Sequence, residues 1–300
     1  MRIAIAASTG HIGSRIVEHL LDAGAKVVLL CRDPKKVEVF TRRGAQVERG
    51  SLEDVKFLNQ ATRGVDALFW MTPPNYKSED FRAWQNKVGR AAQAAIRENQ
   101  IPRVVNLSSA GAQLDSGVGP IGGLHDVEKL LDEVCPNVTH LRPGFFFENF
   151  LMQVEHMKHE SCLYGTVSGT REFAMVATQD IARIAADRLL DERWTGRSVR
   201  GIHGPTDLSY EEAVKEISKG IGRPIRYVQV AEQDVRSAMI SMGLSAQMAD
   251  LLLEMYRAAD RGLLIPAEPR THETTTPTKL EDFAREVLAP VVAGEVYAGA

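Results

Sequence analysis

The chain has 300 residues, of which 44% are hydrophobic and 25% are charged, a composition typical of a globular protein. Its formal net charge of −3 argues against a nucleic-acid partner, and no apolar run approaches the roughly 18 residues of a membrane span. The three scattered cysteines, Cys31, Cys135 and Cys162, indicate neither a disulfide framework nor a zinc site, and without an export signal we expect a cytoplasmic protein.

Apolar strand patterns alternate with amphipathic helix patterns through the first two thirds of the chain. This alternation predicts an α/β fold, a Rossmann-like doubly wound parallel sheet with helices on both faces. The predicted strands span residues 2–7, 26–31, 46–49, 66–71, 102–107, 137–142 and 198–203, and the predicted helices span 12–24, 34–43, 53–63, 78–99, 123–134 and 178–191. Ligands of such a sheet bind at the carboxyl ends of the strands, where the strand order reverses.

The alternation breaks in two regions, which we assign to a smaller, mainly helical C-terminal lobe that shapes a substrate pocket. The first contains a Phe-rich helix pattern and a Gly/Ser-rich stretch from Tyr164 to Thr170, and the second is helical with one strand pattern, Ile225 to Val230. A last helix over about 278–288 is expected to return to the main domain. The expected division is a dinucleotide-binding domain of residues 1–142 and 178–205, a substrate lobe of residues 143–177 and 206–277, and a C-terminal helix and tail of residues 278–300.

The first thirteen residues carry the strongest chemical signal. An alternating apolar run ends at a glycine turn, and an amphipathic helix pattern follows at once. The exposed N–H groups of such a turn and the helix dipole favour a pyrophosphate, so this segment predicts a dinucleotide site. In the pattern Gly-x-x-Gly-x-x-Gly, Ala7 replaces the first glycine, Gly10 would let the backbone approach the phosphates, and Gly13 would let the helix pack closely on the strand. The predicted cofactor contacts here are Ala7, Ser8, Thr9, Gly10, His11, Ile12 and Gly13.

The end of the second strand favours NADP(H) over NAD(H). An NAD site usually carries an acidic residue there for the ribose 2′-hydroxyl, whereas this chain has Arg32, with Lys35 and Lys36 just beyond. A guanidinium suits a 2′-phosphate, so we predict Arg32 and Lys36 as phosphate contacts. Two alternatives remain open: the lysines are solvated helix-start residues, and Asp33 is either an N-cap ahead of Pro34 or an NAD-type carboxylate.

Five stretches of the chain together resemble one known family. They are Ala7-Ser-Thr-Gly10-His-Ile-Gly13, Leu30-Cys-Arg32-Asp-Pro34, Gly64-Val-Asp66-Ala-Leu-Phe69, Arg103-Val-Val-Asn106-Leu-Ser108-Ser109-Ala110 and Thr139-His-Leu-Arg142-Pro143-Gly144-Phe-Phe-Phe-Glu148-Asn149. The combination resembles the NmrA-like family of atypical short-chain dehydrogenase/reductases over nearly the whole chain. The resemblance implies either an NADPH-dependent quinone or azo-dye reductase, or a redox-sensing regulator that binds the dinucleotide without turnover.

The resemblance also implies roles for residues at the ends of the later strands. Thr72 and Pro73 would line the adenosine-ribose and pyrophosphate side, and Ser108 would approach the nicotinamide. The further contacts that it implies are Met71, Pro143 and Phe145. The acidic residue that often follows the third strand's glycine is Ser51 here, a departure at the usual adenine contact.

Catalytic residues are harder to place. A standard short-chain dehydrogenase uses a serine after strand five and a Tyr-x-x-x-Lys motif, whose spacing puts both side chains on one helix face. The tyrosine is missing here, and the best match is His125-Asp-Val-Glu-Lys129. Because histidine titrates near neutrality, His125, Lys129 and Ser108 are the candidate catalytic residues. The alternatives are His125 as a pocket wall or helix cap, a solvated Lys129, and Glu128 as the family's helix glutamate.

A quinone or azo acceptor needs no dedicated acid, because water can protonate the stabilised hydroquinone anion. The missing tyrosine therefore counts against carbonyl–alcohol chemistry more than against quinone reduction. A flat acceptor would stack on the aromatic side chains after strand six, for which the alternative is a place in the core. The predicted substrate contacts are Ser109, Phe146, Phe147, Asn149 and Phe150, with Phe145 and Tyr164 beside them.

One further cluster has the residue types of a metal site. His156 and His159 lie on a predicted helix near Glu155, Glu160 and Cys162, and we interpret them as exposed polar residues and predict no metal. A homodimer is expected because C2 dimers are the commonest soluble homo-oligomers, and the helices near 78–99 and 123–134 could pair two subunits.

The leading hypothesis is an NADPH-dependent reductase of a small, flat, conjugated acceptor, with quinones first. The second hypothesis is a non-catalytic NADP(H) sensor that binds a protein partner. The third is a biosynthetic reductase or an epimerase that uses His125 for acid–base chemistry.

Overall fold

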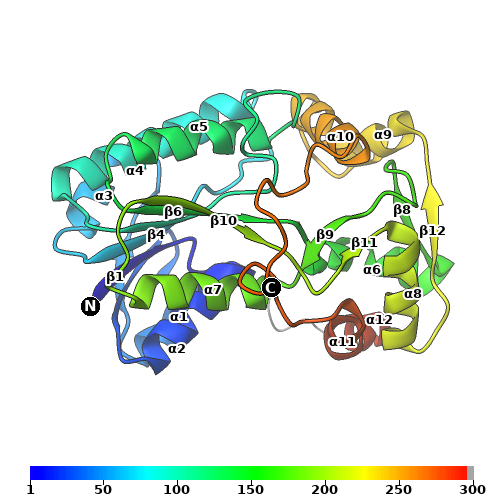
Figure 1. Cartoon of the computed structure of the whole chain (residues 1–300), viewed down its shortest axis with the longest axis horizontal. Helices are drawn as coiled ribbons and strands as arrows, with labels where there is room; N and C mark the ends of the chain where they lie inside the picture. The colour runs from blue at the N-terminus through cyan, green and yellow to red at the C-terminus, as the bar shows by residue number, and fades with distance from the viewer. Residues whose placement is uncertain (296–300) are drawn as a thin grey trace.

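A seven-stranded parallel sheet forms the centre of the molecule in the computed structural model, which describes residues 1–295 (Figure 1). Its strand order is β10-β6-β5-β4-β1-β2-β3, and each neighbouring pair is parallel. The strands are β1 (Arg2–Ala6), β2 (Lys26–Cys31), β3 (Gln46–Arg49), β4 (Ala67–Met71), β5 (Val104–Leu107), β6 (Val138–Pro143) and β10 (Arg197–Ile202). The predicted Rossmann-like doubly wound fold is confirmed, and each predicted strand is present with small shifts at its ends.

Helices cover both faces of this sheet (Figure 1). One face holds α1 (His11–Asp22), the short helices η1 (Pro34–Val37) and α2 (Glu38–Thr41), and α7 (Thr178–Leu190); the other holds α3 (Val55–Ala61), α4 (Phe81–Asn99) and α5 (Ile121–Asp132). Because side chains alternate along a strand, Ile3 and Ile5 join the first core while Ala4 and Ala6 join the second. No helix in residues 1–295 combines the length and apolarity that a membrane span needs.

The strand order places the ligand site. Starting from β1, the chain first moves outward through β2 and β3 and then returns to β4 on the opposite side of β1. The topological switch point therefore lies between the carboxyl ends of β1 and β4, which is where doubly wound sheets bind ligands. The segments that leave these strands, Ala7–Gly10 and residues 72–80, are expected to contact any bound dinucleotide.

The smaller lobe has its own core and two small sheets, ordered β11-β9-β7 and β12-β8. Its elements are β7 (Phe145–Phe146), η2 (Phe147–Gln153), α6 (Val154–Glu160), β8 (Cys162–Gly165), β9 (Phe173–Val176), β11 (Asp207–Leu208), α8 (Tyr210–Ile221), β12 (Arg226–Gln229), α9 (Glu232–Ser241) and α10 (Ala246–Asp260). The strands β7, β8, β9 and β11 were not predicted. Two to four residues are too few to display a period-two pattern.

The last helical segment packs on the lobe, so the expectation that it returns to the main domain is wrong. It comprises α11 (Leu280–Phe283), a π-helical turn (Ala284–Leu288) and α12 (Ala289–Ala293). Leu280, Phe283 and Leu288 are buried in the lobe core against α8. Gly220 of α8 allows this contact, because a Cβ there would lie 2.5 Å from the Cβ of Ala284. The end of the predicted tail, residues 296–300, lies outside the described residues.

A buried ion pair fastens α5 to the sheet. Glu128 of α5 accepts two hydrogen bonds from Arg142 of β6, from Nε at 3.0 Å and from Nη2 at 2.6 Å. The two side chains are 7% and 10% exposed, and Glu268 approaches the same guanidinium at 3.7 Å. The fork geometry satisfies both carboxylate oxygens of Glu128, which a buried charge requires.

Glu128→Ala is expected to lower the free energy of unfolding by about 3 kcal/mol, because it leaves the buried Arg142 with only its longer contact to Glu268. Urea denaturation measures the change. The matched control is Asp250→Ala, which breaks the exposed Arg236–Asp250 pair and is expected to cost less than about 1 kcal/mol. Equal losses in the two variants would contradict a special role for the buried pair.

Candidate functional site

The turn between β1 and α1 has the shape that a dinucleotide-binding loop needs. Ala7, in place of the first glycine, adopts φ +56°, a left-handed conformation that an alanine tolerates at some cost. A Cβ at Gly13 would lie 2.2 Å from the carbonyl oxygen of Ala7, so only glycine lets α1 approach the turn this closely. The atom nearest to a Cβ at Gly10 is that same oxygen at 3.8 Å, which leaves the backbone of Gly10 open on its outer side.

The N-terminus of α1 is free to bind an anion. Its cap residue, Gly10, supplies no side-chain hydrogen bond, and the first turn contains no acidic residue. By contrast, Asp54 caps α3, Asp80 caps α4 and Ser209 caps α8. Ser8, which is fully buried beside this turn, has a hydroxyl without a hydrogen-bond partner in the described chain. Unsatisfied N–H groups, a helix dipole and a spare hydroxyl together fit a pyrophosphate.

Two alanine substitutions separate packing from binding at this turn. Gly13→Ala is expected to lose stability, by about 1–3 kcal/mol, because backbone atoms of Ala7 must move. Gly10→Ala is expected to keep stability within about 1 kcal/mol but to weaken NADPH binding, because its Cβ would face the phosphates. Urea denaturation without cofactor and NADPH titration measure the two effects, and a Gly13→Ala protein as stable as the wild type would contradict the close contact.

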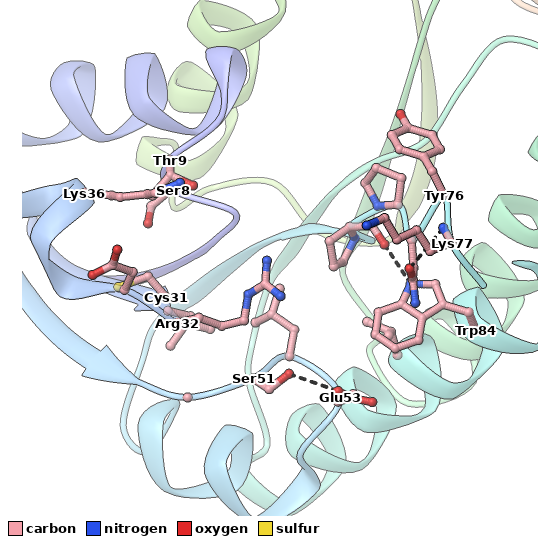
Figure 2. Close-up of a pocket in the computed structure, with 18 residues that line it drawn as sticks. Ser8, Thr9, Cys31, Arg32, Lys36, Ser51, Glu53, Tyr76, Lys77 and Trp84 are labelled. Atoms are coloured by element: carbon pink, nitrogen blue, oxygen red, sulfur yellow. Dashed lines mark hydrogen bonds between the residues drawn. The ribbon is translucent and has the colours of Figure 1, made fainter. Parts of the chain in front are cut away.

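A cavity of about 570 Å³ opens at the carboxyl ends of β1, β2, β3 and β4 (Figure 2). Arg32 extends into it from the end of β2. The side chains that line it include Ser8, Thr9, Cys31, Arg32, Asp33, Lys36, Ser51, Glu53, Pro73, Asn75, Tyr76, Lys77 and Trp84. The predicted contacts Ser8, Thr9, Arg32, Lys36 and Pro73 are therefore brought together around one space. Its volume suits part of a cofactor-sized ligand.

Some charged side chains around this cavity are paired with protein groups, and others are not. Asp33 accepts the backbone N–H of Lys35 at 3.1 Å and caps η1, which matches the N-cap alternative for this residue. Glu53 binds Lys87 at 2.6 Å. Within residues 1–295, the side chains of Arg32 and Lys36 make no hydrogen bond or ion pair. Two unneutralised cations at the end of β2 give the cavity a place for a phosphate.

Sequence reasoning missed residues of the loop after β4 and of the first turn of α4 that also line this cavity. Tyr76, Lys77 and Trp84 lie at its side (Figure 2), and the indole N–H of Trp84 donates to the carbonyl of Pro73 at 2.9 Å. Aromatic residues just beyond the carboxyl end of a parallel strand were the available signal. Thr72 is buried, and its hydroxyl accepts from the indole N–H of Trp70 at 3.2 Å, while Met71 ends the strand half-buried.

The ends of β5 and β6 lie side by side. Ser108 N–H donates to the carbonyl of Leu141 at 2.8 Å, and Ala110 N–H donates to that of Pro143 at 2.9 Å. The Ser108 hydroxyl is buried and has no partner in the described chain, whereas the Ser109 hydroxyl donates to the carbonyl of Ala110 at 3.1 Å. Ser108 and Pro143 are thus adjacent, as a shared nicotinamide contact requires.

His125 is held in one tautomer. Its Nδ1 lies 2.8 Å from the carbonyl oxygen of Ala112, which only accepts, so Nδ1 carries a proton, and in the neutral ring Nε2 then has the lone pair. Nε2 is buried and has no partner within residues 1–295. Lys129, four residues on, is exposed, and Glu128 is committed to Arg142. A neutral imidazole with this tautomer accepts a proton at Nε2 rather than donating one.

The predicted aromatic contacts fall into two groups. Phe147 and Phe150 are each 1% exposed in the lobe core, where Phe147 packs on Phe283 with centroids 5.6 Å apart. Their rings therefore have packing partners on all sides and serve the core. Phe145 and Phe146 are half-buried, as is Asn149. Of the four phenylalanines, Phe145 and Phe146 are the ones that keep surface for a ligand.

The residues of α6 satisfy one another. His156 pairs with Glu160 at 2.9 Å and His159 pairs with Glu155 at 3.3 Å, both one helical turn apart. The Tyr164 hydroxyl donates to Glu160 at 2.6 Å, and its ring meets that of His156 edge-on with centroids 5.0 Å apart, so Tyr164 packs against α6. These side chains are thus paired with one another along α6.

A buried carboxylate joins the lobe to the phosphate loop. Glu148 accepts the N–H of Thr178 at 3.0 Å and its hydroxyl at 2.5 Å, and so caps the start of α7. Burial raises the pKa of the Glu148 carboxyl, and the charge of His11 acts in the opposite direction. His11 is the first residue of α1, so Glu148 lies near the phosphate loop that precedes this helix.

Comparisons with known proteins identify the family of this chain. A model of the NmrA-like family matches residues 1–283. An NAD(P)H azoreductase of Xenophilus azovorans is 29% identical over 257 residues, which cover 86% of this chain and 87% of that protein. Quinone oxidoreductase 2 of Escherichia coli (strain K12) is 26% identical over 266 residues, which cover 87% of this chain and 88% of that protein.

Solved structures share the fold. An NADPH-dependent quinone oxidoreductase from Escherichia coli, solved with NADPH, superposes with a TM-score of 0.78 at 23% identity and covers 94% of this chain and 98% of its own. A Staphylococcus aureus protein described as a nucleoside-diphosphate-sugar epimerase gives a TM-score of 0.81 at 17% identity and covers 95% of this chain and 100% of its own. The family match extends over most of the described fold and includes all five motifs. This chain belongs to the NmrA-like family.

Proposed function

We propose that this protein is an NADPH-dependent reductase that transfers a hydride to a small, flat, conjugated acceptor, with quinones first. The observation that carries the proposal is the pair of unneutralised cations, Arg32 and Lys36, in one cavity with the residues of the phosphate loop. The names of relatives that reduce quinones or azo compounds support the reductase chemistry. Arg32 and Lys36 support the choice of NADPH over NADH.

Each part of the site has a task in this proposal. The N–H groups at the start of α1 and the Ser8 hydroxyl hold the pyrophosphate, and Arg32 and Lys36 hold the 2′-phosphate. The bound cofactor supplies the hydride of its nicotinamide. Ser108 and Pro143, at the adjoining ends of β5 and β6, fix the nicotinamide ring, and Phe145 and Phe146 offer apolar surface to the acceptor.

Positioning does most of the work in such a reaction. A quinone accepts a hydride to give a stabilised anion, so the rate depends mainly on holding two flat rings in contact and excluding competing reactions. The tautomer of His125 supports this division, because in the neutral ring the buried Nε2 has no proton to give. Water then supplies the proton, and His125 holds the loop at Ala112.

The first experiment is NADPH oxidation by the purified protein against quinones, enones and azo dyes, with NADH in parallel. We expect turnover with quinones and a lower KM for NADPH than for NADH. Clear NADPH binding without oxidation by any acceptor would contradict the reductase. That result would favour the sensor, and a search for a protein that binds only one dinucleotide state would follow.

Cofactor choice has a matched test in two neighbouring lysines. Lys36→Gln and Lys35→Gln make the same charge change, but only Lys36 lines the cavity. We expect Lys36→Gln to weaken NADPH binding by about 3- to 10-fold and Arg32→Gln by about 10- to 100-fold, as befits a charged hydrogen bond. Lys35→Gln and NADH binding should stay nearly unchanged. Equal effects of the two lysine variants would indicate a general field rather than a contact.

The His125→Gln variant tests whether His125 donates a proton in the reaction. Because Gln can still donate to the carbonyl of Ala112, we expect kcat for quinone reduction to remain within about 3-fold, with no new pH dependence near neutrality. Initial rates across pH 5–9 measure this. A loss of about 100-fold or more, with disappearance of one limb of the pH profile, would instead assign His125 as the proton donor and favour the acid–base alternative.

A further inference from the structure

The lobe contains a group of tyrosines that the proposed chemistry does not yet use. Tyr210 begins α8, Tyr227 lies in β12 and Tyr256 lies in α10, and all three are half-buried against the lobe core. Tyr210 stacks on Tyr227 with ring centroids 4.7 Å apart and meets Phe145 edge-on at 6.1 Å. Since Phe145 follows Pro143 closely, this aromatic group is continuous with the nicotinamide end of the proposed site.

The hydroxyl groups of these rings differ in what they bind. The Tyr227 hydroxyl donates to the carbonyl of Val167 at 2.6 Å. In the part of the chain from residue 1 to residue 295, the hydroxyls of Tyr210, Tyr256 and Tyr76 make no hydrogen bond. Because these hydroxyls have no protein partner in this part of the chain and are not sealed from solvent, they are open to a ligand that carries oxygen beside the aromatic wall.

Tyr76 connects this group to the cofactor cavity. It lines the cavity, and its hydroxyl points away from Ser51 (Figure 2). Its carbonyl accepts the N–H of Ser245, the cap of α10, at 3.3 Å. Burial and then Tyr76 raise the pKa of Tyr256, and burial and then Tyr256 raise the pKa of Tyr210. The hydrogen bond between Ser245 and Tyr76 places the loop after β4 beside the start of α10, the helix that carries Tyr256.

We propose that Tyr256 and Tyr210 donate hydrogen bonds to the oxygen of an acceptor that lies against Phe145, and so select flat acceptors that carry oxygen. This inference rests on the proposed reductase function. It assigns the choice of acceptor to Tyr256 and Tyr210. The raised pKa of both phenols keeps them neutral through the working range, so they donate hydrogen bonds and leave protonation to water.

The test measures quinone binding apart from turnover. The NADP⁺ complex cannot deliver a hydride, so tetramethyl-1,4-benzoquinone forms a dead-end complex whose Kd calorimetry can measure. We expect Tyr256→Phe and Tyr210→Phe each to weaken this binding by about 3- to 10-fold, the effect of one neutral hydrogen bond. The matched control, Tyr164→Phe, removes a hydroxyl of the same lobe that binds Glu160, and should leave the Kd unchanged.

The outcomes separate this inference from the proposed function. An unchanged quinone Kd in both Tyr256→Phe and Tyr210→Phe would overturn the inference, as would failure of the wild-type NADP⁺ complex to bind the quinone. Equal NADP⁺ affinity in all variants shows that the fold is intact. Tyrosine-dependent quinone binding without NADPH oxidation would instead overturn the reductase while the binding site stands.

Discussion

The close contact between Gly13 and the carbonyl oxygen of Ala7 is the constraint on which the site depends. At 2.2 Å from that oxygen, a Cβ has no place, so the first turn of α1 can lie directly over the end of β1 only with glycine. This contact points the free N–H groups of α1 at the switch point of the sheet. The cations at the end of β2 and the loop after β4 are useful only because the phosphate loop sits between them.

The main domain could be predicted well because its signals are local and repeated. Ile3 and Ile5 alternate with Ala4 and Ala6 between two cores, and this period of two is visible in the sequence. The glycine turn follows β1 and Arg32 follows β2. Because these two strands are neighbours in the sheet, the turn and Arg32 meet at one cavity. Family resemblance and periodicity point to the same architecture, which is why the fold and the family are both confirmed.

The lobe was harder to predict because its structure depends on long-range packing. Its strands β7 and β11 have two residues each, and they exist only because β9 pairs with both. Phe147 and Phe150 look in the sequence like ligand contacts, and only the arrival of Phe283 from far along the chain shows that they are core. The last helix packs on the lobe at Gly220, and no local sequence pattern predicts this contact.

The two parts of the molecule are joined at both ends of the proposed site, and this has a consequence for how it works. Glu148 ties the lobe to the start of α7 near the phosphate loop, and Ser245 ties α10 to the loop that carries Tyr76. The residues proposed to hold the dinucleotide are thus connected to those proposed to face the acceptor. In the proposed reaction, in which water supplies the proton, the rate comes from the positions of the two rings. A site built from two such anchored halves provides the rigidity that geometry requires.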